Sequence, residues 1–266
     1  AIVQFVFDVL TNQEILNEII KKAGLRVSSK IFTPILPPQM IRPQIFESMG
    51  RLNPEDKDER YYLPADDLYL IGSAEHTLGS MHANEIINES DLPLRYIGYS
   101  TSYRRESGSY GKDTRGIFRV HQFDKLEMES FSSSQDGLNE HLFFVAIQEY
   151  LTKALKLPYR VIEICTGDMG KPNAKQSDIE IWLPSQGIYR ETHTADYMTD
   201  YQARRLETKV KREDGKLEFV HTNDATAFAL GRLLVAIIEN NVIEDGIVRV
   251  PEILQAYTKF KEVRKV

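Results

Sequence analysis

The sequence of 266 residues has few of the features that mark secreted, membrane or nucleic-acid-coating proteins. A single cysteine, Cys165, excludes an intrachain disulfide framework and a zinc site built from several cysteines, and it fits a reducing cytoplasm. We find no apolar run long enough to span a bilayer, no signal-peptide pattern, no internal repeat and no low-complexity tract. We therefore expect a cytoplasmic protein that has no membrane partner.

Basic residues are fewer than acidic ones, and the formal net charge is −6. This balance argues against a basic surface that coats nucleic acid, so an RNA partner would be bound through local basic patches. The length suffices for one large domain with a buried core, and we predict a single domain over residues 1–266.

Helical periodicity is clearest in three segments of the chain. Residues 1–24 carry apolar positions at helical spacing and end at Gly24, as one helix or as two helices broken near Thr11. Residues 138–155 predict an amphipathic helix, and residues from about 226 onwards predict another. The residues of these two helices expected to face the core are Leu138, Leu142, Ala146, Tyr150, Ala154, Leu230, Leu233, Leu234, Ile237 and Ile238.

Alternation of apolar and polar residues predicts several strands, and turn residues separate them. The expected strands are 68–71, 96–106, 117–131, 159–166 and 178–184, with a hairpin at 206–221 that turns at Asp214-Gly215. Four prolines between residues 31 and 43 exclude a central strand there, so the residues alone favour a surface loop. This mixture of strands and helices predicts an α/β (α+β) fold.

The most informative stretch is 99–131, which reads as two strands joined by a long polar loop. One face of this hairpin is expected to carry Ser100, Ser102, Arg104, Glu106, Arg119, His121, Phe123, Lys125 and Glu127. The opposite face is expected to carry Phe118, Val120, Leu126 and Met128, and the loop holds Gly108, Gly111, Lys112, Arg115 and Gly116. Arginine forks hold phosphates, and phenylalanine stacks on a purine, so this face suits a nucleotide and an amino acid. An exposed antiparallel face with ordinary salt bridges is the alternative, and alternation alone favours it.

The sequence YRRE at 103–106, followed by GKDTRG at 111–116 and RVHQFDKLE at 119–127, resembles motif 2 of the class II aminoacyl-tRNA synthetases in its seryl-tRNA synthetase form. The resemblance continues through nearly the whole chain. It includes IFTPILPPQMIRP at 31–43 (motif 1), Ser73-Ala74-Glu75, CTGDMGKP at 165–172, Glu191 with Thr194, DYQARR at 200–205, Gly231-Arg232 (motif 3) and VPEILQAY at 250–257.

The resemblance implies a fold with a central antiparallel sheet flanked by helices. It implies an enzyme that activates serine with ATP and Mg²⁺ to seryl-adenylate and transfers serine to the 3′ end of tRNA(Ser). It also implies a homodimer formed through the segment 31–43. In this family no side chain need act as nucleophile, because catalysis is positioning and stabilisation of charge on the phosphates.

The resemblance also implies roles for individual residues, each placed by its match to a family motif. Arg104 and Arg232 are the expected catalytic residues. ATP is expected to bind Arg104, Glu106, Arg119, Phe123, Glu191, Thr194 and Arg232, with Mg²⁺ on the hard oxygen ligands Glu191 and Thr194. The amino acid is expected to bind Ser73, Glu75, Arg104, Glu127, Asp224 and Thr226.

Two departures from the family pattern concern the amino-acid pocket and the start of the chain. Asp224 stands where the family usually has asparagine, and Asp196 lies in a run that also differs from the family. If both face Glu75 and Glu127, four carboxylates crowd together, and their repulsion raises at least one pKa or requires a second cation. We hypothesise either a selectivity moved towards a substrate with a second amine, such as a diaminopropionate, or unchanged use of serine with one aspartate pointing elsewhere. The second reading is favoured.

The family's N-terminal coiled-coil arm, which grips tRNA, precedes the region matched here. We therefore expect a truncated, processed or engineered catalytic core that keeps amino-acid activation and has weakened tRNA binding. Two alternatives stay open: a ligase that charges a carrier protein or another amino acid, and a dimeric binding paralogue without catalysis. Cys165 is expected to be a small core residue and His193 a structural one.

Overall fold

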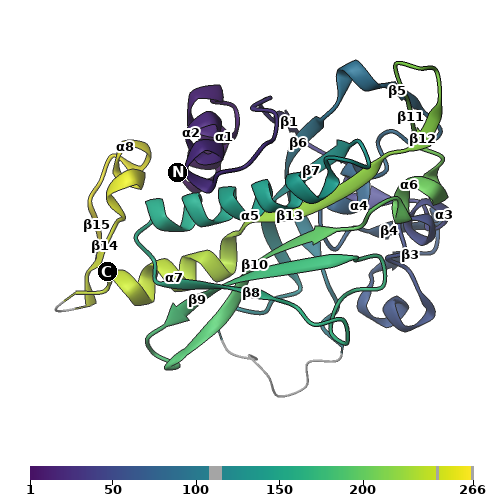
Figure 1. The fold of residues 1–266 in the computed structure, drawn as a ribbon. Helices are drawn as coiled ribbons and strands as arrows, with labels where there is room; N and C mark the ends of the chain where they lie inside the picture. Colours follow the sequence, from purple (N-terminus) through teal and green to yellow (C-terminus); the bar gives the residue numbers. More distant parts are fainter. Residues whose placement is uncertain (108–115, 244–245, 265–266) are drawn as a thin grey trace.

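The computed structural model describes residues 1–107, 116–243 and 246–264, and it is built around one large mixed sheet (Figure 1). The loop glycines and basic residues Gly108, Gly111, Lys112 and Arg115 lie outside the described residues. In the part of the chain that is described, no helix is long and apolar enough to cross a membrane.

Seven strands form the main sheet in the order β1-β6-β7-β13-β10-β9-β8. All neighbours are antiparallel except β1 and β6, which run parallel. The strands are β1 (Thr33–Ile35), β6 (Leu94–Tyr103), β7 (Gln122–Ser132), β8 (Tyr159–Glu163), β9 (Lys175–Leu183), β10 (Ile188–Tyr197) and β13 (His221–Ala229). The predicted α/β fold with a central, mainly antiparallel sheet flanked by helices is confirmed.

Smaller elements surround this sheet. The remaining strands are β2 (Met40–Ile41), β3 (Tyr62–Leu63), β4 (Leu68–Leu70), β5 (Ile86–Asn88), β11 (Lys209–Lys211), β12 (Leu217–Phe219), β14 (Val248–Arg249) and β15 (Glu262–Val263). The helices are α1 (Ile2–Leu10), α2 (Gln13–Ala23), α3 (Pro43–Ser48), α4 (Glu75–Leu78), α5 (Gly137–Ala154), α6 (Tyr201–Leu206), α7 (Leu230–Asn241) and α8 (Gln255–Thr258). Short 3₁₀ turns are η1 (Pro54–Glu59), η2 (Glu89–Asp91) and η4 (Glu252–Leu254).

One face of the sheet packs on α5 and α7, and the main hydrophobic core lies between them (Figure 1). Along β7 the residues alternate strictly: Leu126 and Met128 enter this core, whereas Lys125 and Glu127 line a cavity on the opposite face. The alternation therefore divides the sheet into a structural face and a face that is available for chemistry.

The helix break, helix end and hairpin turn predicted from the sequence are confirmed. The N-terminal helical segment is two helices broken at Thr11 and Asn12, and Asn12 caps the second through its side chain. Gly24 ends that helix in the left-handed conformation, with φ of 65°. The hairpin β11–β12 turns at Gly215, also with positive φ. The proline-rich segment gives two short edge strands, β1 in the main sheet and β2 in the sheet β2-β4-β3, and no central strand, as prolines require.

Three predictions about packing were wrong. In α5, Leu138 and Leu142 are 47% and 38% exposed, while Phe143, Phe144, Ile147 and Leu151 are buried. Each step of four residues advances about 40° around a helix, so five positions at that spacing cannot share one face. The predicted stripe therefore crosses from the surface to the core.

The segment from 226 is the second correction, because His221–Ala229 is a central strand and the helix begins only at Leu230. In that helix Leu233 and Ile237 are buried, but Leu234 and Ile238 are 40% and 46% exposed. Cys165 is the third correction, since it is exposed and follows the end of β8.

Gly50 fixes the turn after α3, where its φ of +70° favours glycine. A Cβ at this position would lie 2.7 Å from Cε1 of the Tyr201 ring and 3.2 Å from Cγ of Pro172. We expect Gly50→Ala to lower the free energy of unfolding by about 1 kcal/mol through the backbone and by about a further 1–3 kcal/mol through the clash. Urea unfolding followed by circular dichroism measures this loss.

Gly24→Ala is the matched control, because Gly24 has nearly the same φ but nothing within 4 Å of the added Cβ. Equal losses of stability in the two variants would contradict the role given to the contact with Tyr201.

Candidate active site

A cavity of about 200 Å³ lies on the face of the sheet opposite α5, at the ends of the central strands. Most of the residues predicted for the site line it: Glu75, Arg104, Glu106, Arg119, Phe123, Glu127, Glu191, Thr194, Asp224, Thr226 and Arg232. Ser73 is buried next to the cavity, where its hydroxyl donates to Glu127 Oε2 (3.3 Å) and accepts from Lys125 Nζ (3.0 Å). The structure therefore gathers the predicted residues from six separate segments.

One end of the cavity is built from arginines and aromatic rings. The Arg104 guanidinium lies 5.3 Å from the centre of the Phe123 ring, and its Nε donates to the Gly72 carbonyl (3.2 Å). Glu106 has a positive φ of 53° and forms an ion pair with Arg119 across the mouth of the hairpin. Cationic forks beside a ring are the arrangement that binds phosphates and an aromatic base.

Phe118 and Val120 were predicted to point away from this face together with Leu126 and Met128. Phe118 does belong to the main hydrophobic core, but both residues also line the cavity, because residues 117–121 are irregular and only Gln122 begins the strand. The Phe118 ring packs against two guanidinium groups, 5.1 Å from that of Arg232 and 4.3 Å from that of Arg190. It thus supports the cationic rim.

Arg232 sits at the start of α7 and reaches over to β10. Its Nη1 donates to the Glu191 carbonyl (3.1 Å) and to the Glu191 carboxylate (3.0 Å). A guanidinium has five donors, so this pairing leaves donors of Arg232 for a further anion in the cavity.

A β-bulge explains how Glu191 and Thr194 come to share one side. In a regular strand residues three apart face opposite ways, but the register of β10 on β9 shifts between Glu191 and His193. A second shift lies between Thr226 and Phe228 on β13. These two irregularities coincide with the place where β10 and β13 stop pairing, beyond Ala195 and Ala225.

Gln148 of α5 binds the two strands where they separate. Its amide nitrogen donates to the carbonyls of Thr194 (2.9 Å) and Thr226 (2.8 Å). These carbonyls would otherwise be buried without partners, which is costly. Sequence reasoning gave Gln148 no role, because its partners lie 46 and 78 residues away.

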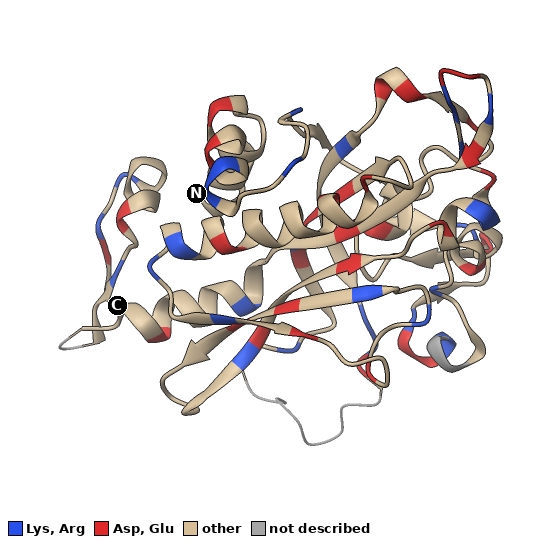
Figure 2. Ribbon diagram, viewed as in Figure 1, with Lys and Arg blue, Asp and Glu red and all other residues tan. Residues whose placement is uncertain are grey.

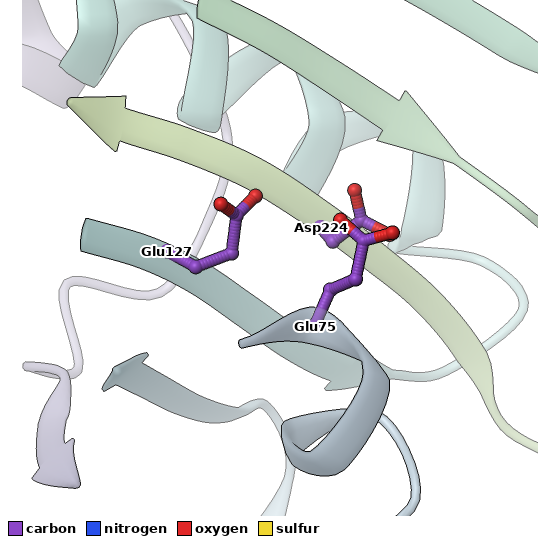
Figure 3. Close-up of side chains that lie close together, drawn as sticks. All are labelled: Glu75, Glu127 and Asp224. Carbon is purple, nitrogen blue, oxygen red and sulfur yellow. The ribbon is translucent and has the colours of Figure 1, made fainter. Parts of the chain in front are cut away.

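Carboxylates crowd the other end of the cavity (Figure 3). Glu75 at the start of α4, Glu127 on β7 and Asp224 on β13 offer oxygens that all lie within 4.8 Å of one another. The Thr226 hydroxyl is 3.5 Å from Glu127 Oε2, and Lys125 Nζ is 2.5 Å from the same oxygen. Asp196 joins them from β10, so both unusual aspartates face the cavity. The expectation that one aspartate points elsewhere was wrong.

Arg51 supplies the second cation that the crowding requires, and the sequence reading missed it. Its Nε lies 3.1 Å from Glu75 Oε1, and its Nη2 lies 3.3 Å from Asp224 and 3.4 Å from Asp196. No motif drew attention to Arg51, although a glycine before it signals the turn that directs it inward. The sequence signal that could have pointed to Arg51 is the pair Gly50-Arg51, a turn residue followed by a cation, in a chain whose predicted pocket is acidic.

Burial and crowding shift the pKa values of the carboxyl groups at this end of the cavity. Burial, partly offset by Lys125, raises the pKa of Glu127 to about 7, and burial, partly offset by Arg51, raises that of Asp196 to about 6. Burial and the nearby Glu75 raise the pKa of Asp224 well above its usual range. Burial would raise the pKa of Glu75 as well, but Arg51 and His76 outweigh it and hold that pKa well below its ordinary value.

Glu129 is a fifth carboxylate at this end, and sequence reasoning missed it too. It pairs across the sheet with Asp224, is fully buried, and neither oxygen has a hydrogen-bond partner among the described residues. Burial and the carboxylates of Asp224, Glu75 and Glu127 raise its pKa well above the usual range. Burial without a hydrogen-bond partner therefore favours the protonated form of Glu129.

His193 does not line the cavity. It is 1% exposed, packs on the Phe228 ring at 5.0 Å and shares a hydrogen bond with the Thr192 hydroxyl. Burial lowers its pKa to about 3, so the imidazole is neutral. This position agrees with the structural role predicted for it.

Figure 2 shows acidic and basic residues interspersed along the central strands of the sheet. Residues 60–241 match the family model described as the tRNA synthetase class II core domain (G, H, P, S and T). The serine–tRNA ligase of Pyrococcus horikoshii is 48% identical over 240 residues, which is 90% of this chain and 52% of that protein. That of Thermobifida fusca is 47% identical over 226 residues, 85% of this chain and 53% of the relative. The chain thus spans about half the length of the curated relatives it matches.

Solved structures give the same result. The crystal structure of seryl-tRNA synthetase from Pyrococcus horikoshii complexed with ATP matches with a TM-score of 0.85 and 42% identity, over 100% of this chain and 57% of that one. The cytoplasmic serine–tRNA ligase from Naegleria fowleri in complex with AMP matches with a TM-score of 0.82 and 33% identity, over 99% of this chain and 60% of that one.

The raised pKa values make stability depend on pH. Asp178 lies on β9 opposite Thr194, and burial and the nearby Glu191 raise its pKa to about 7. With Glu127 at about 7 and Asp196 at about 6, these groups bind protons in the folded chain that the unfolded chain has released above about pH 4. The free energy of unfolding should therefore fall as the pH rises from 5 to 7, by about 1.4 kcal/mol per pH unit for each such proton. Asp178→Asn should flatten this slope, measured by urea unfolding at each pH.

The exposed Asp66→Asn serves as the control and should leave the slope unchanged. A free energy of unfolding that rises over this pH range would contradict the account of the carboxylate cluster.

Proposed function

We propose that this chain, which belongs to the class II tRNA synthetase core-domain family, activates serine with ATP to form seryl-adenylate. The observation that carries the proposal is the position of Arg104. Its guanidinium lies against Phe123 while its Nε is bonded to Gly72, beside the segment that carries Ser73 and Glu75. Arg104 therefore joins the cationic, aromatic end of the cavity to the carboxylate end, where the two substrates must meet.

The chemistry is an in-line displacement at the α-phosphorus of ATP. An oxygen of the serine carboxylate forms the new P–O bond, and the bond to the pyrophosphate oxygen breaks as pyrophosphate leaves with its electrons. Arg104 holds the α-phosphate and the carboxylate together, which lowers the barrier by positioning and charge stabilisation. No side-chain nucleophile is required.

ATP is placed by the residues of the cationic end. Phe123 stacks on adenine, and Glu106, which forms an ion pair with Arg119, accepts from the adenine amine. Arg119 and Arg232 hold the triphosphate, with Arg232 on the γ-phosphate. The 20% exposure of the Arg232 side chain, against 50% for Glu191, supports this role, because the cation is the more enclosed partner of the pair.

Glu191 and Thr194 fit Mg²⁺ in the chemistry of their donors, and the bulge at Thr192 turns both towards the cavity. Both are hard oxygen ligands and would hold the ion. When bound there, Mg²⁺ would neutralise charge on the phosphates. Glu191 is held for this purpose by Arg232, which fixes its carboxylate from the α7 side.

Serine is placed by the carboxylate end. Its ammonium requires anionic partners, which Glu75 and Glu127 provide. Ser73 and Lys125 keep the Glu127 carboxylate fixed through their contacts at 3.3 and 2.5 Å. The serine hydroxyl then reaches Thr226 and Asp224, which lie deeper on β13.

The second step, transfer of serine to the 3′ end of tRNA(Ser), and a cytoplasmic homodimer complete the proposal. Leu36 and Met40, beside the edge strand β1, are 80% and 49% exposed. Exposed apolar side chains at a sheet edge support association through the segment 31–43.

The catalytic unit spans residues 1–266, since the main core includes residues from Phe5 to Leu254.

ATP–pyrophosphate exchange tests the proposal, with serine expected to be the best substrate among the standard amino acids. Arg104→Ala should lower kcat/KM for exchange about 10- to 150-fold, because each charged hydrogen bond contributes about 1.5–3 kcal/mol. The exposed Arg26→Ala is the matched control and should exchange normally. Absence of exchange with every amino acid would refute the proposal and favour a binding module.

A further inference from the structure

Arg51 enters the cavity from a part of the chain that belongs to none of the matched motifs. It follows α3 directly, after the left-handed turn at Gly50, which Tyr201 and Pro172 enclose. This turn sends the Arg51 side chain inward, where it is only 15% exposed. A buried guanidinium must be paired with anions, because leaving it unpaired is very costly.

The Arg51 guanidinium is held by three carboxylates on three elements. Glu75 of α4 lies 3.1 Å from Nε, and Asp224 of β13 and Asp196 of β10 lie 3.3 and 3.4 Å from Nη2. The Met198 sulfur is a fourth contact at 4.0 Å. With partners on three sides, the group is fixed in one position and cannot swing out of the cavity.

The position of Arg51 decides whether the side chain of the substrate amino acid can carry a positive charge. Asp224 and Thr226 are the groups proposed to meet the substrate's hydroxyl, and Arg51 contacts Asp224 directly. A hydroxyl oxygen accepts hydrogen bonds from such a cation, whereas an ammonium in the same place is repelled by it. The crowding of carboxylates alone would have favoured a second amine, but the chain already provides the cation.

We propose that Arg51 determines specificity, by closing the end of the amino-acid pocket with a positive charge that admits a hydroxymethyl side chain and rejects an aminomethyl one. This inference rests on the proposed activation of serine. It assigns the discrimination between serine and 2,3-diaminopropionate to a residue outside the matched motifs.

The test compares two substrates in the same enzyme. Exchange of pyrophosphate is measured with L-serine and with L-2,3-diaminopropionate for the unaltered chain, Arg51→Gln, Arg51→Lys and the control Arg26→Gln. Arg26 is exposed and lies outside the cavity and outside the segment 31–43. The ratio of the two kcat/KM values should fall at least tenfold towards diaminopropionate in Arg51→Gln. It should stay within about threefold in Arg51→Lys and unchanged in the control.

The ratio separates specificity from structure, because a purely structural role for Arg51 would lower both kcat/KM values equally. Asp196→Asn provides a second test that does not depend on the folding of Arg51→Gln. Asp196 lies 3.4 Å from Arg51 and has a pKa of about 6, so its carboxylate is charged in an assay above pH 7. Removing this charge leaves Arg51 less neutralised, so the variant should reject diaminopropionate more strongly than the unaltered chain does.

An unchanged ratio in Arg51→Gln, or a ratio that is unchanged or shifted towards diaminopropionate in Asp196→Asn, would overturn the inference while leaving serine activation intact. Absence of serine exchange in the unaltered chain would instead refute the proposed function itself.

Discussion

The separation of β10 and β13 is the constraint on which the cavity depends. The two strands pair only through Ala195–Tyr197 and Asn223–Ala225, and then diverge where each has an irregular register. Separated strands expose backbone carbonyls that a buried region must satisfy. Gln148 satisfies two of them from the other side of the sheet, so the helix that closes the core also holds the cavity open. The β-bulges in β10 and β13 also turn side chains into the cavity that would point away from it in a regular strand.

Electrostatics supply the second constraint, since five carboxylates meet two cations at one end of the cavity. Such a cluster is tolerable only when its charges are paired or its acids hold protons. The chain uses both means: Arg51 and Lys125 form ion pairs with Glu75 and Glu127, while burial raises the pKa of Glu129 and favours its protonated form. A substrate that brings an ammonium supplies further positive charge, which explains why the cluster is matched to an amino acid. The opposite end of the cavity, rich in arginine, is matched to phosphates.

The sequence predicted the composition of the site better than its packing. Residues within continuous motifs, such as Arg104, Phe123 and Glu127, were identified because strand alternation and the family pattern agree on them. Arg51 and Glu129 escaped notice, because their importance comes from partners on distant strands and no local pattern marks them. The faces of α5 and α7 were misjudged, since the helix periodicity does not reveal that polar residues such as Glu140 and Gln148 would be buried. Glu140 is buried because it pairs with Arg95 through two hydrogen bonds of 2.8 and 2.5 Å.

The central claim is that one cavity binds ATP and serine at its two ends and joins them at Arg104. Calorimetric titration with a non-hydrolysable seryl-adenylate analogue, in which a sulfamate replaces the phosphate, tests this claim directly. The account predicts one analogue bound per chain, with an affinity higher than that of adenosine or serine alone and sharply reduced by Arg104→Ala. Binding no tighter than that of adenosine alone would contradict it, because the carboxylate end would then contribute nothing to recognition.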